Sequence, residues 1–177
     1  ASQSFTITPR PVTLTWSDTG TGETKLIYNG SAYIPTATAG NLVEDDECTV
    51  TVTGEQTNAG NHTATASALS NSNYMLPDEH TQGFTITPKT IGDGTATPAA
   101  NITLTGIDES YVYTGSELQP SVTLAYAQLP GEDKAITASG NYLVSYSDAN
   151  HDNVNVANGG IVTITGTGNY TGNIVKT

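Results

Sequence analysis

Gly83-Phe84-Thr85-Ile86-Thr87-Pro88-Lys89 has a near copy in Ser4-Phe5-Thr6-Ile7-Thr8-Pro9-Arg10, and this pair of segments determines the predicted fold. In both copies phenylalanine and isoleucine alternate with threonine, which is the period-2 pattern of a half-buried strand. The proline that follows cannot donate a backbone hydrogen bond, so strand pairing should stop there. The copies are 84 − 5 = 79 residues apart, the length of one small domain. The repetition therefore predicts two tandem modules, residues 1–89 and 90–177, and each copy is predicted to be a terminal strand.

Alternating hydrophobic patterns predict further strands in both modules. They cover residues 12–16, 25–28, 47–53 and 62–69 in the first module, and 102–104, 111–113, 122–126, 142–146 and 161–165 in the second. The strands at 47–53 and 62–69 should form a hairpin with Ala64, Ala66 and Ala68 on one face. No window has the i, i+3, i+4, i+7 spacing of an amphipathic helix, so the predicted fold class is all-β.

The composition excludes several classes of partner. A net charge of −12 with five Lys and Arg leaves no basic stripe for nucleic acid and disfavours anionic membrane surfaces. The single cysteine, Cys48, has no partner for an internal disulfide and is expected to be a buried strand residue. No apolar run is long enough to cross a bilayer, so we expect no membrane insertion of this stretch and any leader or anchor to lie outside it.

Histidine provides no sign of catalysis. A nucleophilic hydrolase needs a Ser or Cys with a positioned His, and no G-x-S-x-G motif accompanies His62, His80 or His151. The three histidines are therefore expected to be polar surface residues. We expect that the protein is not an enzyme and that it needs no cofactor.

Two acidic segments are candidates for calcium sites. The run Glu44-Asp45-Asp46-Glu47 is expected to be a solvated loop, because charge runs are usually exposed. Asp148, Asn150 and Asp152 have the spacing of the first three ligands of an EF-hand loop. The later glycine and bidentate glutamate of that loop are missing, so these three residues are weak metal candidates and folding should need no ion.

The tyrosines divide into repeated and unmatched positions. Tyr28 matches Tyr113, and Tyr74 matches Tyr170, which indicates packing and not ligand binding. The unmatched aromatic residues could form a platform on which a sugar stacks. The ligand candidates for such a platform are Trp16, Tyr33, Tyr111 and Tyr126.

Several motifs recur in a pattern known from other proteins. They are Tyr113-Thr-Gly-Ser-Glu-Leu-Gln-Pro120, Val144-Ser-Tyr-Ser-Asp148, Val162-Thr-Ile-Thr-Gly-Thr-Gly-Asn-Tyr-Thr-Gly172 and the tail Phe84-Thr-Ile-Thr-Pro88. These motifs resemble the tandem repeats of bacterial surface proteins called MBG, or mirror β-grasp, domains. The resemblance implies small β-rich modules, β-grasp-like or immunoglobulin-like, in a secreted or wall-attached protein, and it brings no catalytic residues.

Two functions remain open from the sequence. The first is a structural spacer or stalk at the bacterial cell surface, with modules end to end and neighbouring repeats as partners. The stiff Thr87-Pro88-Lys89 joint, which has no flexible Gly/Ser run, supports this expectation. The second is an adhesive module that binds a host glycan or protein through exposed aromatics or a sheet edge. An extracellular location is expected in both cases.

Overall fold

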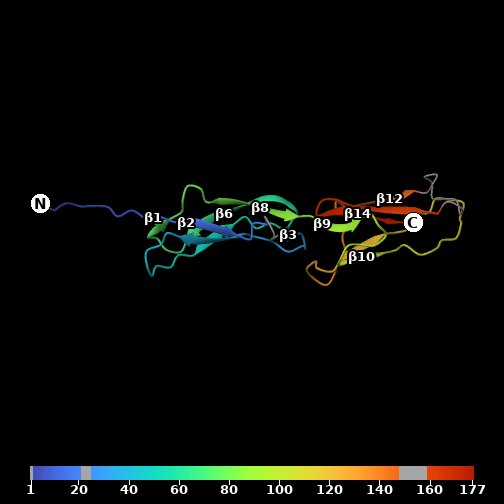
Figure 1. Cartoon of the computed structure of the whole chain (residues 1–177), viewed down its shortest axis with the longest axis horizontal. Coiled ribbons are helices and arrows are strands. Elements are labelled where there is room, and N and C mark those ends of the chain that lie inside the picture. Colours follow the sequence, from blue (N-terminus) through green and yellow to red (C-terminus); the bar gives the residue numbers. More distant parts are fainter. Residues whose placement is uncertain (1, 21–24, 148–158) are drawn as a thin grey trace. The chain divides into compact units, whose positions relative to one another are not determined.

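The computed structural model describes residues 2–20, 25–147 and 159–177, and these residues form strands, turns and loops without a helix (Figure 1). The predicted all-β class is confirmed. No helix that could cross a membrane occurs in the described part of the chain. The chain divides into a first compact unit, Ala1–Leu26 with Ala32–Ile86, and a second, Ile27–Ser31 with Thr87–Thr177.

The first unit is built around a four-stranded sheet. The first eight strands of the chain are β1 (Arg10–Pro11), β2 (Thr13–Ser17), β3 (Leu26–Ile27), β4 (Thr36–Gly40), β5 (Val50–Thr53), β6 (Gly60–Leu69), β7 (Tyr74–Met75) and β8 (Thr81–Thr87). The large sheet has the order β3-β8-β6-β5, so β8 is a central strand. β2 pairs antiparallel with β4, and β1 pairs parallel with β7. The repeated stretch at residues 83–87 therefore lies in the middle of the main sheet.

The second unit repeats this plan. Its strands are β9 (Lys89–Asp93), β10 (Ile102–Thr105), β11 (Thr123–Tyr126), β12 (Tyr142–Ser147), β13 (Ile161–Gly166) and β14 (Tyr170–Lys176). The four-stranded sheet has the order β12-β13-β14-β9, and β10 pairs antiparallel with β11. The last strand again runs parallel to the first, with Tyr170 opposite Lys89 as Tyr74 lies opposite Arg10. The sequence repeat is therefore also a repeat of topology.

The last strand is built differently in the two units. β14 is a single strand whose pairing with β9 shifts between Thr171 and Gly172, whereas the first unit splits the same path into β7 and β8. Gly172 has a φ of +79°, and a Cβ there would overlap the carbonyl oxygen of Gly92. Glycine is needed at this position because other residues rarely adopt that φ and because the two backbones approach closely.

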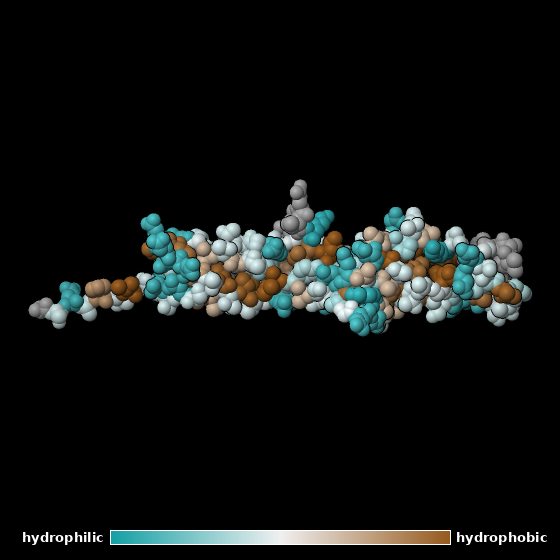
Figure 2. Space-filling view, turned by 90° about the horizontal axis from the view of Figure 1, so that it is seen from below, coloured by the Kyte–Doolittle hydropathy of each residue, from teal (hydrophilic) through white to brown (hydrophobic). Residues whose placement is uncertain are grey.

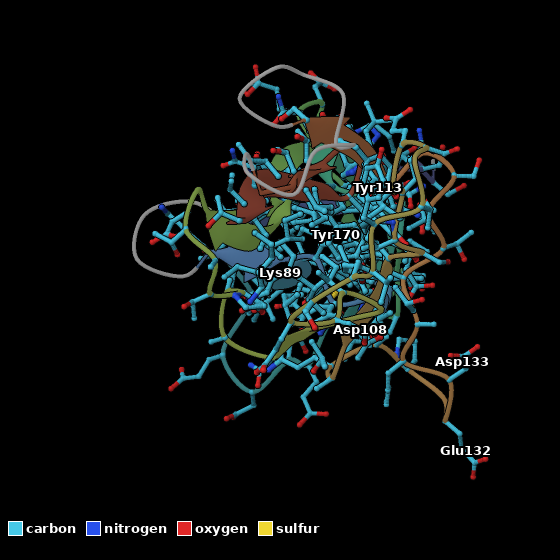
Figure 3. All side chains as sticks on the ribbon, turned by 90° about the vertical axis from the view of Figure 1, so that its right-hand side faces the viewer. Lys89, Asp108, Tyr113, Glu132, Asp133 and Tyr170 are labelled. Atoms are coloured by element: carbon cyan, nitrogen blue, oxygen red, sulfur yellow. The ribbon has the colours of Figure 1, made fainter. Side chains whose placement is uncertain are left out.

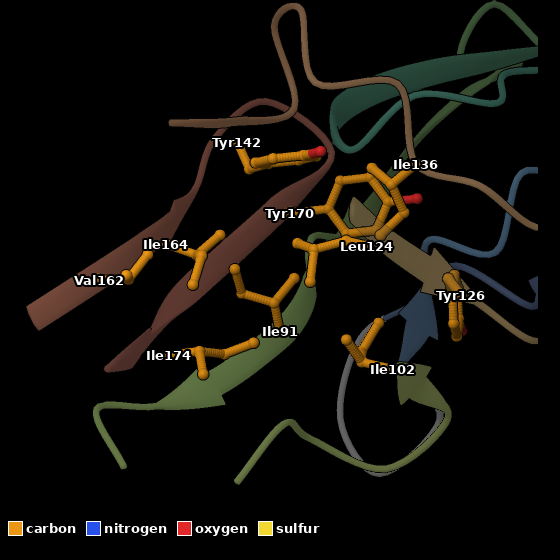
Figure 4. Packing of buried hydrophobic residues seen from close by; sticks show 10 residues of the cluster. All are labelled: Ile91, Ile102, Leu124, Tyr126, Ile136, Tyr142, Val162, Ile164, Tyr170 and Ile174. Atoms are coloured by element: carbon orange, nitrogen blue, oxygen red, sulfur yellow. The ribbon is translucent and has the colours of Figure 1, made fainter. Parts of the chain in front are cut away.

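The second unit has the larger core. Ten buried residues pack together between its sheets (Figure 4): Ile91, Ile102, Leu124, Tyr126, Ile136, Tyr142, Val162, Ile164, Tyr170 and Ile174. Tyr170 is central, with its ring edge-on to Tyr126 at 6.4 Å and to Tyr28 at 5.3 Å between centroids. Burial raises the pKa of the Tyr170 hydroxyl, because the charged form cannot be solvated there. The hydrophobic core of the first unit is smaller: Val12, Ala64, Ala66, Tyr74, Phe84 and Ile86.

The segment Ile27–Ser31 comes from the first repeat but belongs to the second unit. Tyr28 packs against the second unit's core, and its amide donates to the carbonyl of Thr87 at 2.9 Å. Gly30, with a φ of +79°, lies against Pro130. The sequence predicts a division between residues 89 and 90. In the structure the second unit begins at Thr87 and also contains this short turn of the first repeat.

Most of the predicted strands are present, and the exceptions have physical reasons. Residues 111–113 form no strand, so that prediction is wrong. The alternation on β6 fails at Ala68, which is exposed, because a bulge opposite Thr51 and Val52 shifts the register. Cys48 is half-buried and precedes β5, so it is not the buried strand residue expected.

The first copy of the repeated stretch, residues 4–9, has no strand pairing. Phe5 is 86% exposed and Ile7 is 84% exposed, although their equivalents Phe84 and Ile86 are buried. The prediction that both copies are paired strands is wrong for this copy. A half-buried strand pattern specifies which face is apolar, but a strand needs a neighbour with which to pair.

Candidate functional site

The second unit contains a groove with a volume of about 540 Å³. It lies between the loop that follows β10 and the ends of β13 and β14. The lining residues are Ile107, Asp108, Glu109, Ser110, Tyr111, Tyr113, Leu118, Pro120, Gly159, Gly160, Val162, Lys176 and Thr177. The groove is open and mixes apolar with charged side chains.

Short local contacts build the loop that lines the groove. Gly106, with a φ of +90°, turns the chain after β10 where a Cβ would meet the carbonyl of Ser121. The Asp108 amide then donates to the Tyr111 hydroxyl oxygen at 2.7 Å. At the far side, the Tyr146 hydroxyl donates to the Pro120 carbonyl at 2.6 Å. The first bond joins two residues of the loop, and the second attaches the chain at Pro120 to β12.

The aromatic side chains of this loop face solvent. Tyr111 is 43% exposed, Val112 is 85% exposed and Tyr113 is 57% exposed. Figure 3 shows Tyr113 and Asp108 on this loop. Burial raises the pKa of Tyr146, which bonds to the groove residue Pro120, with a smaller contribution from Tyr111. The exposed rings, with carboxylates and Lys176 beside them, can stack on an apolar or sugar face and hydrogen-bond polar groups.

The structure distributes the four ligand candidates over different environments. Tyr111 lines the groove. Trp16 on β2 and Tyr33, which bridges to Gln56, are half-buried in the first unit. Tyr126 is 1% exposed in the second core, so the expectation that it belongs to an exposed platform is wrong. The Tyr126 side chain points into the core, because β11 places every second residue, Leu124 and Tyr126, on its buried face.

Tyr113 was missed by the sequence reasoning. Its match to Tyr28 indicated a packing role, and Tyr28 does pack against Tyr170. Tyr113 instead lies in a loop and is exposed. Nothing in the alternating pattern distinguishes these two tyrosines, since both precede a turn glycine.

The acidic run at residues 44–47 is an exposed loop that is attached to the first core. The Tyr74 hydroxyl donates to the Asp46 carboxylate at 2.5 Å and accepts from the Val43 amide at 2.8 Å. The hydrogen bond to Asp46 raises the pKa of Tyr74. Asp46 therefore has a structural partner.

The candidate metal ligands and the histidines form no shared cluster in the part of the chain that the structure describes. Among those residues, no group of three His, Cys, Asp or Glu could hold an ion. Asp148, Asn150, Asp152 and His151 lie outside the described residues. His62 has its Nε2 at 2.8 Å from the Asn58 carbonyl oxygen, and His80 has its Nδ1 at 3.0 Å from the Asp78 carbonyl oxygen.

No protein-family model, curated protein or solved structure matches this chain. The function is therefore inferred from its repeats and from the groove.

Proposed function

We propose that the chain is a pair of structural spacer repeats from a bacterial cell-surface protein of the MBG-like type. The observation that carries the proposal is the repeated topology with a one-residue connection. β8 ends the first module at Thr87 and β9 begins the second at Lys89, so Pro88 alone separates them. A proline has a fixed φ and donates no hydrogen bond, which makes it a stiff connection.

The composition supports a spacer outside the cell. A net charge of −12 favours solubility. In this role the modules hold another domain away from the cell wall. Their partners are neighbouring repeats.

Small-angle scattering tests the spacer role on this chain. Modules in a row, as the sequence predicts, should give a radius of gyration of about 21–23 Å. One compact body of the same length should give about 16 Å, and that result would remove the physical basis of the proposal. The same measurement on the Pro88→Gly variant is the matched control, because a freer joint should broaden the distance distribution.

An adhesive role is the second candidate, and the groove with exposed Tyr111 and Tyr113 favours it. Binding to an oligosaccharide array should then be lost in the Tyr111→Ala, Tyr113→Ala variant. Tyr33→Ala in the first unit serves as the matched control and should bind as the parent does. If the parent chain binds no glycan or host matrix protein above background, the adhesive role is rejected.

A further inference from the structure

The repeated stretch is buried in β8 and exposed at residues 2–9. This contrast indicates that the exposed copy is suited to pair as a strand with another partner. The segment Ser2–Pro9 aligns with Thr81–Pro88, and six of the eight positions are identical, namely Gln, Phe, Thr, Ile, Thr and Pro. In β8 this sequence is a central strand. In Ser2–Pro9 it has no regular structure, and Figure 2 shows hydrophobic residues on the surface of this N-terminal segment.

The contacts of β8 define what this sequence is suited to bind. Phe84 lies opposite His62 and Ile86 opposite Gly60 on β6, with 2% and 0% exposure. On its other side, the Thr85 amide donates to the carbonyl of Thr19 at 3.1 Å. The strand thus fills a slot between two neighbours, and its two apolar side chains complete the core.

The two substitutions within the segment are compatible with the same slot. Ser4 stands where β8 has Gly83, and a Cβ at Gly83 would have only the His62 carbonyl oxygen near it, at 3.9 Å. That is an ordinary contact distance, so a serine fits without displacement. Ser2 replaces Thr81, and both are small hydroxyl residues.

The residues that follow each copy also match. After Pro88, the Lys89 amide donates to the Asn169 carbonyl at 3.0 Å to start β9. After Pro9, the Arg10 amide donates to the Asn73 carbonyl at 2.9 Å to start β1. Each proline therefore precedes the first strand of a module, and β8 shows that the closing strand of another module stands directly before such a proline.

We infer that Ser2–Pro9 is a closing strand that completes a module of this same repeat type, joined directly on its N-terminal side. Phe5 and Ile7 enter that module's core as Phe84 and Ile86 do here. The structural module boundary thus falls at the proline, and Ser2–Pro9 is assigned to a neighbour. The inference is independent of whether the repeats act as spacers.

A chain with one added module tests this directly. A second copy of residues 10–80 is fused to the N-terminal side of Ser2, so that the added copy lacks its own β8. The amides of residues 5–8 should become protected from hydrogen exchange by more than about 100-fold relative to the 177-residue chain. In a comparator chain, a second copy of residues 10–88 is fused directly to Arg10, and this chain differs from the test chain at only two positions.

The Phe5→Asp, Ile7→Asp variant provides the decisive contrast. It should unfold the added copy in the test chain and leave the amide protection of the 177-residue chain unchanged. Unprotected amides at 5–8 while the comparator's extra copy is folded would overturn the inference. Equal protection in the Asp variant would overturn it too. A dimer of the 177-residue chain that the Asp variant abolishes would show that a second copy is the occupant instead.

A simpler variant tests the fit within the present chain. Thr81→Ser with Gly83→Ser converts β8 into the sequence of Ser2–Pro9. The first unit should keep its melting temperature to within about 4 °C. A larger fall would show that the N-terminal sequence does not fit the slot and would contradict the inference.

Discussion

Phe5-Thr6-Ile7-Thr8-Pro9 and Phe84-Thr85-Ile86-Thr87-Pro88 are identical, yet the first is exposed and the second is the centre of a sheet. Local propensity is the same in both segments, so it cannot account for the difference. The second segment has β6 on one side and β3 on the other. The comparison shows that a strand pattern states a capacity to pair, and the available neighbours determine whether pairing occurs.

Phe84→Ala should have the largest effect, because it removes a ring that is 2% exposed. Truncating a buried phenylalanine costs about 3–5 kcal/mol, and the first unit should melt more than about 12 °C lower. Calorimetry measures the shift, and hydrogen exchange of β6 identifies the unit affected. A shift as small as that of Phe5→Ala would mean that β8 is not the packed strand described.

Ile174→Ala examines the closing strand of the second unit. Ile174 is fully buried and lies opposite Ile164, as Phe84 lies opposite His62. A loss of about 2–5 kcal/mol is expected, somewhat less than for the phenylalanine. Val175→Ala on the same strand is the control, since Val175 is half-buried and should cost clearly less. Equal losses would contradict the proposed equivalence of β8 and β14.

The tyrosines opposite the first strands, Tyr170 and Tyr74, should both make the stability of their units depend on alkaline pH. The pKa of Tyr170 is raised above its ordinary value of 10.0 by burial, so the folded unit favours the neutral ring. The contribution of Tyr170 to the free energy of unfolding is fully present below pH 10.0, the ordinary pKa of tyrosine, and is lost as the pH rises above it. Urea titrations from about pH 8 to about pH 11 should show this decline for the second unit.

Tyr170→Phe should flatten the alkaline dependence of the second unit. Tyr74→Phe should flatten that of the first, where a hydrogen bond to Asp46 is the main cause of the raised pKa. An unchanged slope in either variant would show that its tyrosine does not cause the dependence.

The smallest effect is expected for Phe5→Ala combined with Ile7→Ala. Both side chains are more than four-fifths exposed, so the free energy of unfolding of this chain should change by less than about 0.5 kcal/mol. Denaturant titration monitored by Trp16 fluorescence measures it for the first unit. A loss above about 1 kcal/mol would show that the segment already packs against this chain.

The sequence was sufficient for the all-β class and for most strand positions. The alternation of apolar and polar residues at 142–146 and 161–165 is typical only of a strand, and these segments are β12 and β13. The sequence was insufficient for the groove. Tyr113 and Tyr28 occupy matching positions, but Tyr28 packs against the core of the second unit and Tyr113 is exposed in a loop.

Residue order alone established the repeat, the apolar face of most strands and the proline at which pairing stops. These features depend only on local backbone chemistry and on the alternation of side chains. Packing between distant segments established the rest. It buried Phe84 but not Phe5, moved the 27–31 turn into the second unit and put Tyr126 inside the core. Burial and pairing are long-range properties, because they depend on neighbours that lie far away along the chain.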